Sequence, residues 1–299
     1  MNRPYLVGEW RLRATMTLAV VAPLLVALLL AWYASAQRPE APQPLVLTPA
    51  ASISTSQVDA LFARYDYHWP PVTGVPAIAV KRLPSGLGEL PVEQRKSLFF
   101  RMLLPLVVVE NQRLQAEREW LQALHADGAY AASQQLKSLA AEYRLDPSLP
   151  PDELLESLLQ RVDVVPVALV LAQAANESGW GTSRFSREAN NLFGEWTYQA
   201  ELGLLPQRRP QGATHYVRRF DTLRHSLRSY LHNLNSGMAY ESFRHIRAEM
   251  RVQGQELEPL RLAEGLLRYS ARGGDYVREI QLMIRNNGLN TLGPLDLRR

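Results

Sequence analysis

The residue best placed to do chemistry in this sequence is Glu177, in the stretch LVLAQAANESGWGTSRF between residues 169 and 185. Val170 lies seven residues earlier and Ala174 three residues earlier, so the spacing puts the carboxyl group on an apolar face, in the last turn of a helix. Apolar surroundings and the negative end of the helix dipole both disfavour the ionised carboxylate. The sequence therefore predicts a carboxyl group that stays protonated near neutral pH, as a general acid requires.

The residues after Glu177 predict a tight exit from this helix. Gly179 and Gly181 allow a sharp turn that leaves the acid accessible, while Trp180 can pack against the acid or into the core. A solvated glutamate at a frayed helix end, followed by a glycine stop, would show the same spacing. The pattern alone is compatible with both interpretations.

The elements that must position this segment are mostly helices. Apolar periodicity and end signals predict helices over 55–65, 92–125, 131–144, 151–160, 165–178, 240–251, 259–269 and 275–286. Pro105 should kink the second of these or split it in two, and Asp152 could cap the fourth. Asp221 is expected to cap a further helix whose apolar stripe is Leu223, Leu227, Tyr230, Leu231 and Leu234. With a strand predicted at 214–220, the fold class is mainly α with a short β excursion around 195–220.

The N-terminal segment predicts export. Residues 14–37 contain no charged side chain, a run of about 24 residues that is long enough to span a bilayer. Arg3, Arg11 and Arg13 precede it, which keeps the N-terminus in the cytoplasm. The alternative is a cleaved signal peptide, because residues 34–36 read Ala-Ser-Ala.

Composition excludes several other functions. The chain has 299 residues, a net charge of +4 and no cysteine, so disulfides and thiolate metal sites are excluded. The six histidines form no HExxH pattern, and no cofactor or metal is expected. Without a long Lys/Arg block or an RNP-like aromatic pattern, nucleic acid is not an expected partner. The small positive surplus suits a mildly anionic partner, such as a lipid surface or a cell-wall polymer.

Three motifs carry a resemblance to a known family. The stretch AQAANESGWGTSRFSREANNLFGEW is similar to the signature of the glucosaminidase family of peptidoglycan hydrolases, in which Glu-Ser-Gly-Trp-Gly is followed by Asn-Leu-Phe-Gly. The segment YSARGGDY at 269–276 resembles a downstream Tyr-Ala-Thr-Asp-x-x-Tyr motif of the family. HNLNSGMAYESFRHIR points more narrowly to the Bax-like branch. The resemblance covers roughly residues 164–289 and says little about 37–150.

The resemblance implies a lysozyme-like α fold and hydrolysis of the β-1,4 bond after N-acetylglucosamine in peptidoglycan. Glu177 matches the general acid of the family, and Tyr269 and Tyr276 match tyrosines that shape its cleft. A second carboxylate is expected between residues 194 and 220, where Glu201 is the first candidate and Glu195 the second, although neither matches the family motif. If neither serves, the N-acetyl group of the substrate assists or activity is lost.

Several residues near the motifs are candidates for substrate binding. Trp196 and Tyr198 could stack on sugar rings or pack the β excursion, Phe193 could equally be a core residue, and Asn191 a turn residue. Arginines in the runs QRRP and VRRF could meet the carboxylates of peptide stems, although such runs are usually solvated. The candidate substrate-binding residues are Trp180, Asn191, Phe193, Trp196, Tyr198 and Tyr276.

The sequence thus predicts a cell-envelope glycosidase whose partners are peptidoglycan and, through its N-terminal helix, the inner membrane. The expected division is a cytoplasmic N-terminus (1–13), a membrane anchor (14–36), a Pro-rich linker (37–54), a helical extension (55–150), a periplasmic catalytic domain (151–290) and a tail (291–299). A secreted form after signal cleavage is the alternative location. The rival functions are a lytic transglycosylase, a non-catalytic peptidoglycan-binding scaffold, and a signalling or partner-binding role in 37–150; the oligomeric state is open.

Overall fold

The computed structural model describes residues 21, 24–26, 38, 46–47, 53–72, 74–127, 134–206, 212, 214–293 and 295–298. Within these residues, no helix combines the length and the apolar character needed to cross a bilayer. The predicted anchor and the Pro-rich linker lie largely outside the described residues, so both stay predictions.

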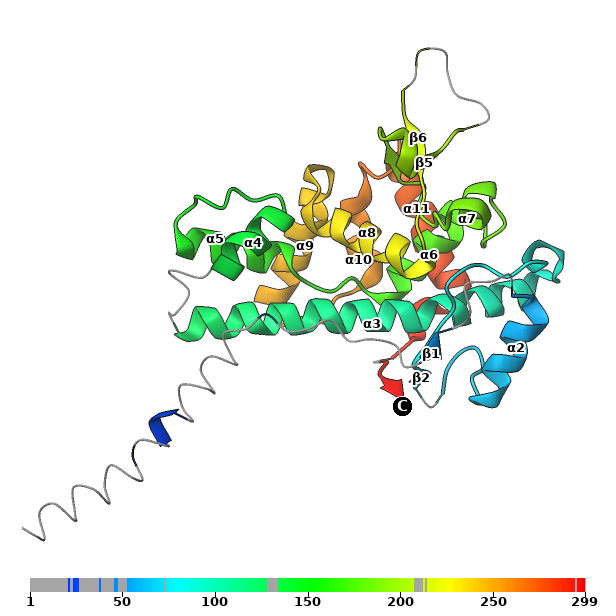
Figure 1. The fold of residues 1–299 in the computed structure, drawn as a ribbon, viewed down its shortest axis with the longest axis horizontal. Coiled ribbons are helices and arrows are strands. Elements are labelled where there is room, and N and C mark those ends of the chain that lie inside the picture. The colour runs from blue at the N-terminus through cyan, green and yellow to red at the C-terminus, as the bar shows by residue number, and fades with distance from the viewer. Residues whose placement is uncertain are drawn as a thin grey trace, which may run out of the picture.

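The longest element is α3, Val92–Asp127, which runs along one side of the other helices (Figure 1). Pro105 does not split this helix, because α3 continues through it as one helix of 36 residues; the alternative of a kink at Pro105 stays a prediction. Proline removes one backbone donor and costs about 3 kcal/mol in a helix interior. Leu104 and Leu106 on either side of it are fully buried, and burial of this apolar face offsets that cost.

The fold is mainly helical, as the sequence predicts. Thr222 and not Asp221 caps α8, since the Thr222 hydroxyl accepts a hydrogen bond from the His225 amide at 3.2 Å while the Asp221 side chain is exposed. Asp152 lies in the first turn of α5, whose N-cap residue is Pro150. The other α-helices are α2 (Thr55–Arg64), α4 (Gln134–Glu142), α5 (Pro151–Arg161), α6 (Val167–Ser178), α7 (Arg184–Ala189), α8 (Leu223–Ser236), α9 (Glu241–Val252), α10 (Pro259–Ala263) and α11 (Gly274–Asn286). Short 3₁₀ turns are η1 (Leu87–Glu89), η2 (Ala200–Leu202), η3 (Met238–Tyr240), η4 (Glu264–Leu266) and η5 (Leu289–Thr291).

The strands are short and form three small sheets. β4 (Trp196–Thr197), β6 (Tyr216–Arg218) and β5 (Gly203–Leu204) pair antiparallel in the order β4-β6-β5, and β6 falls within the predicted strand. We call the segment 194–220 the β-lobe; its strands project from the helical body beside α6 and α7 (Figure 1). Elsewhere β1 (Val46–Leu47) pairs with β3 (Ile78–Ala79), and β2 (Val75–Pro76) pairs with β7 (Leu297–Arg298) in the predicted tail.

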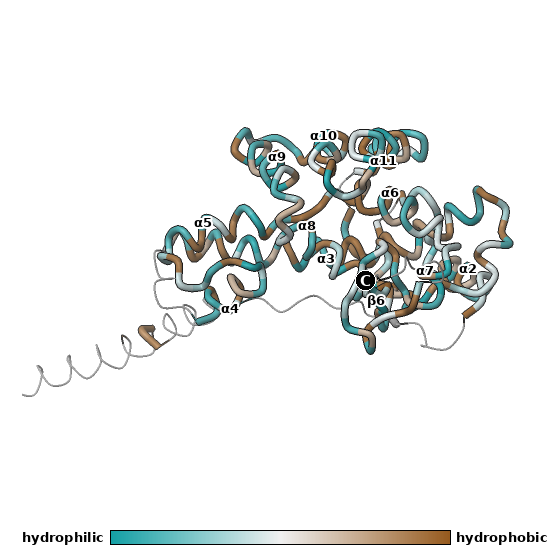
Figure 2. Tube along the Cα trace, turned by 90° about the horizontal axis from the view of Figure 1, so that it is seen from above, coloured by the Kyte–Doolittle hydropathy of each residue, from teal (hydrophilic) through white to brown (hydrophobic). Residues whose placement is uncertain are grey.

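The core is centred on α6, which packs against α3 and α11. In α6 the residues from Leu169 to Ala172 are fully buried, and they belong to the same hydrophobic cluster as Phe62 of α2 and Phe99 of α3. The core is therefore continuous across the domain boundary predicted after residue 150, and the division itself stays a prediction. A second cluster joins α4, α5 and the end of α3. The helices alternate between hydrophobic and hydrophilic segments, as amphipathic helices do (Figure 2).

Candidate active site

Glu177 occupies the last turn of α6, one residue before the helix ends. Its side chain is partly buried, and burial raises the pKa of its carboxyl group because a charged carboxylate is poorly solvated there. Hydrogen bonds from Tyr276 and Asn176, together with the charge of Arg272, act in the opposite direction. The raised pKa is in the direction that the sequence leads one to expect, and a protonated carboxyl group can give up a proton.

A chain of buried hydrogen bonds from three helices orients the groups behind Glu177. The Tyr230 hydroxyl of α8 donates to Gln173 Oε1 at 2.5 Å, and Gln173 Nε2 donates to the Tyr276 hydroxyl oxygen at 2.8 Å. Since that oxygen already accepts from Gln173, the proton of Tyr276 is free to point toward Glu177. Gln173 is fully buried, one helical turn before Glu177. Sequence reasoning missed it, although a lone amide within an apolar helical run was a usable signal.

Tyr269 and Tyr276 stack with ring centroids 5.2 Å apart. Burial raises the pKa of both hydroxyl groups, so both remain protonated hydrogen-bond donors. Tyr269 donates to the Phe193 carbonyl at 3.3 Å, and the Phe193 ring, which is 4% exposed, stacks on Tyr230 at 3.8 Å. The structure thus brings both predicted tyrosines to the Glu177 side of the core and places Phe193 inside the packing beneath them.

Asn191 fixes the base of the β-lobe. Its amide nitrogen donates to the carbonyl oxygens of Glu195 and Arg218, each at 2.8 Å, and its amide oxygen accepts from the Glu195 backbone at 3.0 Å. The whole amide is therefore used in joining the start of the lobe to β6. Asn191 was a candidate for substrate binding, and in the structure these bonds give it a positioning role.

Glu195 is a second carboxyl group whose environment is unusual. Its Oε2 accepts from the Ser229 hydroxyl at 2.7 Å and lies 3.6 Å from Arg218, while its Oε1 is buried without a partner among the described residues. Burial raises the pKa of Glu195, and Ser229 and Arg218 oppose that effect. Tyr240 lies within electrostatic reach of both Glu195 and Glu177, so the two acids share one region of the molecule.

The remaining predicted site residues fall into exposed and packed groups. Trp196 is 62% exposed although one face of its ring stacks on His215 with centroids 4.1 Å apart, and Tyr198 is 76% exposed, so both side chains are accessible to a ligand. Glu201 is exposed in η2. Trp180 turns toward α3 instead, with its ring 5.2 Å from that of Phe100.

The exit from α6 depends on consecutive left-handed residues. Gly179, Trp180 and Gly181 have φ angles of 56°, 58° and 76°. The Ser178 hydroxyl donates to the Ala174 carbonyl at 2.6 Å and accepts from the Gly181 amide at 2.9 Å, which holds this turn. The turn determines where the chain leaves Glu177.

Gly181→Ala should lower the free energy of unfolding by about 1–3 kcal/mol. The added methyl would stand 2.8 Å from Leu87 Cδ2 and 3.1 Å from Leu83 Cδ1, in a backbone conformation that alanine disfavours. Urea unfolding measures the loss. Gly254→Ala is the control, because Gly254 has φ +66° but nothing within 4 Å, and an equal loss there would show that the packing at Gly181 is not the cause.

The site combines a partly buried acid of raised pKa, a second acid nearby and exposed aromatic rings on an adjoining lobe. Glycosidases use groups of these kinds. Residues 153–289 match the Glucosaminidase family model, described as mannosyl-glycoprotein endo-beta-N-acetylglucosaminidase. The chain is also 32% identical over 211 residues to Protein bax of Escherichia coli (strain K12). The matched region covers 70% of this chain and 73% of that protein. The chain belongs to the glucosaminidase family of glycosidases, in its Bax-like branch.

Two solved structures are also similar to parts of the chain. The truncated glycoside hydrolase domain of Salmonella typhimurium FlgJ is 22% identical, with a TM-score of 0.31, and the match covers 43% of this chain and 86% of that one. The catalytic domain of the autolysin Auto from Listeria monocytogenes is 16% identical, with a TM-score of 0.34, over 57% of this chain and 94% of that one.

Proposed function

We propose that this chain hydrolyses the β-1,4 bond after N-acetylglucosamine within peptidoglycan strands, with Glu177 as the general acid in a lysozyme-like domain. The main support is the environment of the Glu177 carboxyl group. Burial raises its pKa, and the Tyr276 hydroxyl donates a hydrogen bond to it. Membership of the glucosaminidase family supports the reaction class. The net charge of +4 suits an anionic wall polymer.

In this reaction, protonated Glu177 gives its proton to the glycosidic oxygen as the bond breaks. The Tyr276 hydrogen bond then stabilises the carboxylate that is left. Exposed Trp196 and Tyr198 offer rings on which sugars can stack.

For the second group we propose Glu195 in place of Glu201. Glu195 is partly buried at the base of the lobe, has a raised pKa and shares the region of Tyr240 with Glu177, whereas Glu201 is exposed in η2. A base whose pKa lies closer to the working pH accepts a proton more effectively. Glu195 would then activate the attacking water or orient the N-acetyl group of the substrate.

Glu195→Gln should lower kcat on purified peptidoglycan by about 10²–10⁴-fold, the range found for general acid–base groups. The amide keeps the volume of the side chain and can still accept from Ser229, so the lobe should stay folded. The release of reducing ends measures kcat. Glu201→Gln is the matched control and should stay near wild type; a larger loss in that variant would make Glu201 the second group.

Tyr276→Phe should move the alkaline limb of the pH–rate profile to higher pH. The hydrogen bond from Tyr276 favours ionised Glu177, so removing it raises the pKa of that acid further, and Glu177 stays protonated and active to a higher pH. The position of the alkaline limb is measured by plotting kcat/KM against pH between about 4 and 9, roughly the range in which carboxyl groups of raised pKa titrate. Tyr269→Phe is the control, since its hydroxyl donates to the Phe193 carbonyl. A limb that stays in place or moves to lower pH in Tyr276→Phe contradicts the assignment.

The reaction itself is tested by digesting purified peptidoglycan with the full chain and resolving the fragments by mass spectrometry. Fragments with reducing-end N-acetylglucosamine are the expected product. Anhydro-muramic ends would identify a lytic transglycosylase. If folded protein binds the glycan but releases no fragments, the chain is a peptidoglycan-binding protein and not a hydrolase.

We also propose that residues 14–36 hold the chain in the inner membrane, with the helical extension and the catalytic domain in the periplasm. The support is the uncharged run of about 24 residues behind Arg3, Arg11 and Arg13. The intact mass of the chain isolated from membranes tests this proposal. A mature chain that begins after Ala36 would show a cleaved signal peptide.

A further inference from the structure

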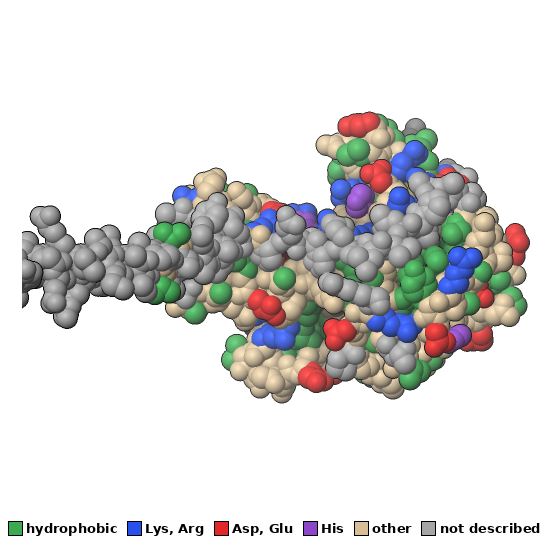
Figure 3. Space-filling view, turned by 60° about the horizontal axis from the view of Figure 1, so that its bottom comes forward, with side chains coloured by type: hydrophobic (Ala, Val, Ile, Leu, Met, Phe, Trp, Pro, Cys, Tyr) green, Lys and Arg blue, Asp and Glu red, His purple; other side chains and the backbone are tan. Residues whose placement is uncertain are grey.

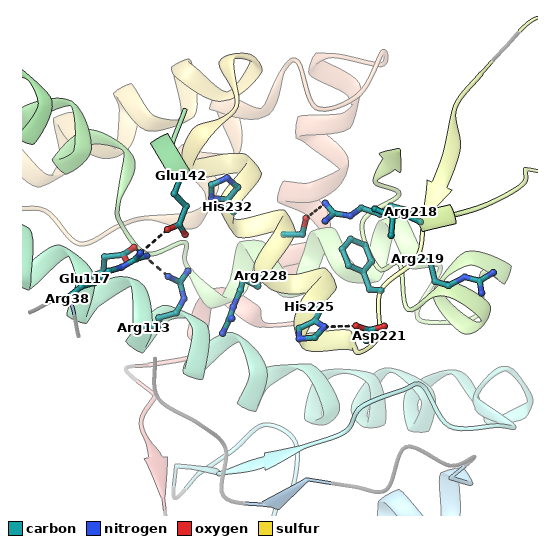
Figure 4. A pocket seen from close by; sticks show the side chains of 13 residues that line it. Arg38, Arg113, Glu117, Glu142, Arg218, Arg219, Asp221, His225, Arg228 and His232 are labelled. Carbon is teal, nitrogen blue, oxygen red and sulfur yellow. Dashed lines mark hydrogen bonds and ion pairs between the residues drawn. The ribbon is translucent and has the colours of Figure 1, made fainter. Parts of the chain in front are cut away.

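A cavity of about 750 Å³ opens beside Glu195, between the helical extension and the β-lobe (Figure 4). Its volume lies within the range of roughly 300–1,000 Å³ found for ligand pockets. We call it the arginine pocket, after the guanidinium groups that come to it from separate elements. Basic and histidine side chains gather in the recess at the base of the projecting lobe (Figure 3). The lining includes Arg113 and Glu117 of α3, Arg218 of β6, and Arg228, Ser229 and His232 of α8.

The arginine pocket touches the residues that hold the second acid. Ser229 donates to Glu195 at 2.7 Å and accepts from Arg218 at 2.9 Å, and both Ser229 and Arg218 line the pocket. A ligand that contacts Ser229 in the pocket would therefore touch a side chain that is hydrogen-bonded to Glu195. The Arg218 side chain is directed toward Ser229, whereas Arg219 extends away from the other labelled side chains (Figure 4).

Two arginines of the lining, Arg113 and Arg228, also bind Glu110, a buried acid that is not itself part of the lining. Glu110 is fully buried and is bound by Arg224 at 2.6 Å, Arg228 at 2.9 Å and Arg113 at 3.1 Å. One carboxylate therefore faces three guanidinium groups. Arg228 uses its Nε and Nη2 atoms on Glu110, its side chain is 40% exposed, and its Nη1 has no hydrogen-bond partner in the part of the chain that is described.

The acids of the lining reduce this surplus but do not remove it. Among the described residues, five arginines line the pocket against three acids: Glu117 and Glu142, which share Arg38, and Asp221, which lies 3.7 Å from His225. The pKa of the His232 imidazole is lowered by burial first and then by Arg144, Arg113 and Arg218, while Glu142 opposes them. The lowered pKa favours the neutral form of His232, and Arg228 presents an unshared guanidinium donor to a ligand.

We propose that the arginine pocket binds a carboxylate of the peptide stem that peptidoglycan carries on its muramic acid residues, with Arg228 as the main contact. A planar guanidinium group with a free edge matches a carboxylate, and such charge-assisted hydrogen bonds are stronger than neutral ones. The pocket lies beside the proposed second acid, where a stem next to the cleaved bond would pass. The inference rests on the proposed function and deepens it, because it makes the peptide part of the recognised substrate.

Two substrates test the proposal with the full chain: glycan strands with intact stems, and the same strands after an amidase has removed the stems and the lactyl carboxylates left on the muramic acid residues have been converted to amides. Wild type should show a higher kcat/KM on the stem-bearing strands. In Arg228→Gln the ratio of the two kcat/KM values should fall about tenfold, which corresponds to one lost charge-assisted hydrogen bond. Arg261→Gln is the matched control, since its side chain is also 40% exposed and bound to a glutamate, and it should keep the wild-type ratio.

The ratio separates recognition from folding, because unfolded protein lowers both rates by the same factor. If Arg228→Gln fails to fold, Arg228→Lys takes its place; it keeps a cation beside Glu110 but loses the planar fork. Equal wild-type rates on the two substrates, or an unchanged ratio in the folded variant, would overturn the proposal.

If the chain cleaves no strand, the proposed function is overturned, but carboxylate binding by the arginine pocket can still be tested. A binding measurement provides that test. Calorimetry on the full chain carrying Glu177→Gln compares a disaccharide-peptide with the same compound after its stem carboxylates have been amidated. Tighter binding of the carboxylate form, lost when Arg228→Gln is added, is the expected result. Equal binding of the two forms would overturn the arginine pocket as a carboxylate site.

Discussion

Glu177→Gln should lower kcat on peptidoglycan by about 10²–10⁴-fold, because glutamine cannot give a proton to the leaving oxygen. The substitution keeps the size of the side chain and leaves Asn176 and Tyr276 with a polar neighbour. The fragments released from purified peptidoglycan measure the loss. We expect fragments with reducing-end N-acetylglucosamine from wild type and almost none from the variant.

The loss should not come from unfolding. The pKa of Glu177 is raised in the folded chain, so the stability of the chain is full below the unfolded pKa of this acid and falls as the pH rises through the folded pKa. A glutamine does not titrate and avoids that loss. Glu177→Gln should therefore be at least as stable as wild type at pH 7 in urea unfolding. A variant that keeps wild-type turnover would remove Glu177 from the mechanism.

Arg247→Met should lower the free energy of unfolding by about 3–5 kcal/mol, the range for removing one partner of a buried ion pair. Arg247 is 1% exposed, and its guanidinium group donates to Asn235 Oδ1 at 2.7 Å and to the Arg161 carbonyl at 3.0 Å. It also donates to the carbonyl oxygens of Gln160, Asp163 and Val164. Methionine fills part of the volume but leaves these acceptors unpaired.

This cluster joins α9 to the segment that leads into α6. Asp163 is 2% exposed and accepts from Arg251 at 2.8 and 3.0 Å, and Arg118 lies 3.6 Å away. Burial opposes ionisation of Asp163, but these arginines outweigh it and lower its pKa. Because Asp163 and Val164 closely precede α6, the cluster fixes the start of the helix whose far end carries Glu177.

Urea unfolding measures the stability of Arg247→Met, with Arg261→Met as the surface control. Arg261 is 40% exposed and pairs with Glu249 at 3.5 Å, so its removal should change stability by at most about 1 kcal/mol. Comparable losses in the two variants would contradict a structural role for the buried cluster.

The sequence by itself determined most of the helices, the strand within the β-lobe and the family. It did not predict α7, and the helix predicted over 259–269 is the shorter α10 followed by the 3₁₀ turn η4. The position of Glu177 on an apolar face at a helix end follows from spacings of three and seven residues, which one helix fixes without help from the rest of the chain. The buried stripe of α8 follows from the same periodicity, and Leu223, Leu227 and Leu231 are all buried. Local interactions within one helix are enough to set these features.

Only the tertiary structure decided which groups surround Glu177. Gln173 and Tyr276 are 103 residues apart in the chain, and Arg228 and Glu110 are 118 apart, so no spacing within one element relates them. The unbroken course of α3 through Pro105 depends on burial against other elements, which outweighs a local preference. Burial also separates Glu195 from Glu201, two acids that the sequence could not distinguish, because the pKa of a carboxyl group depends on what packs around it.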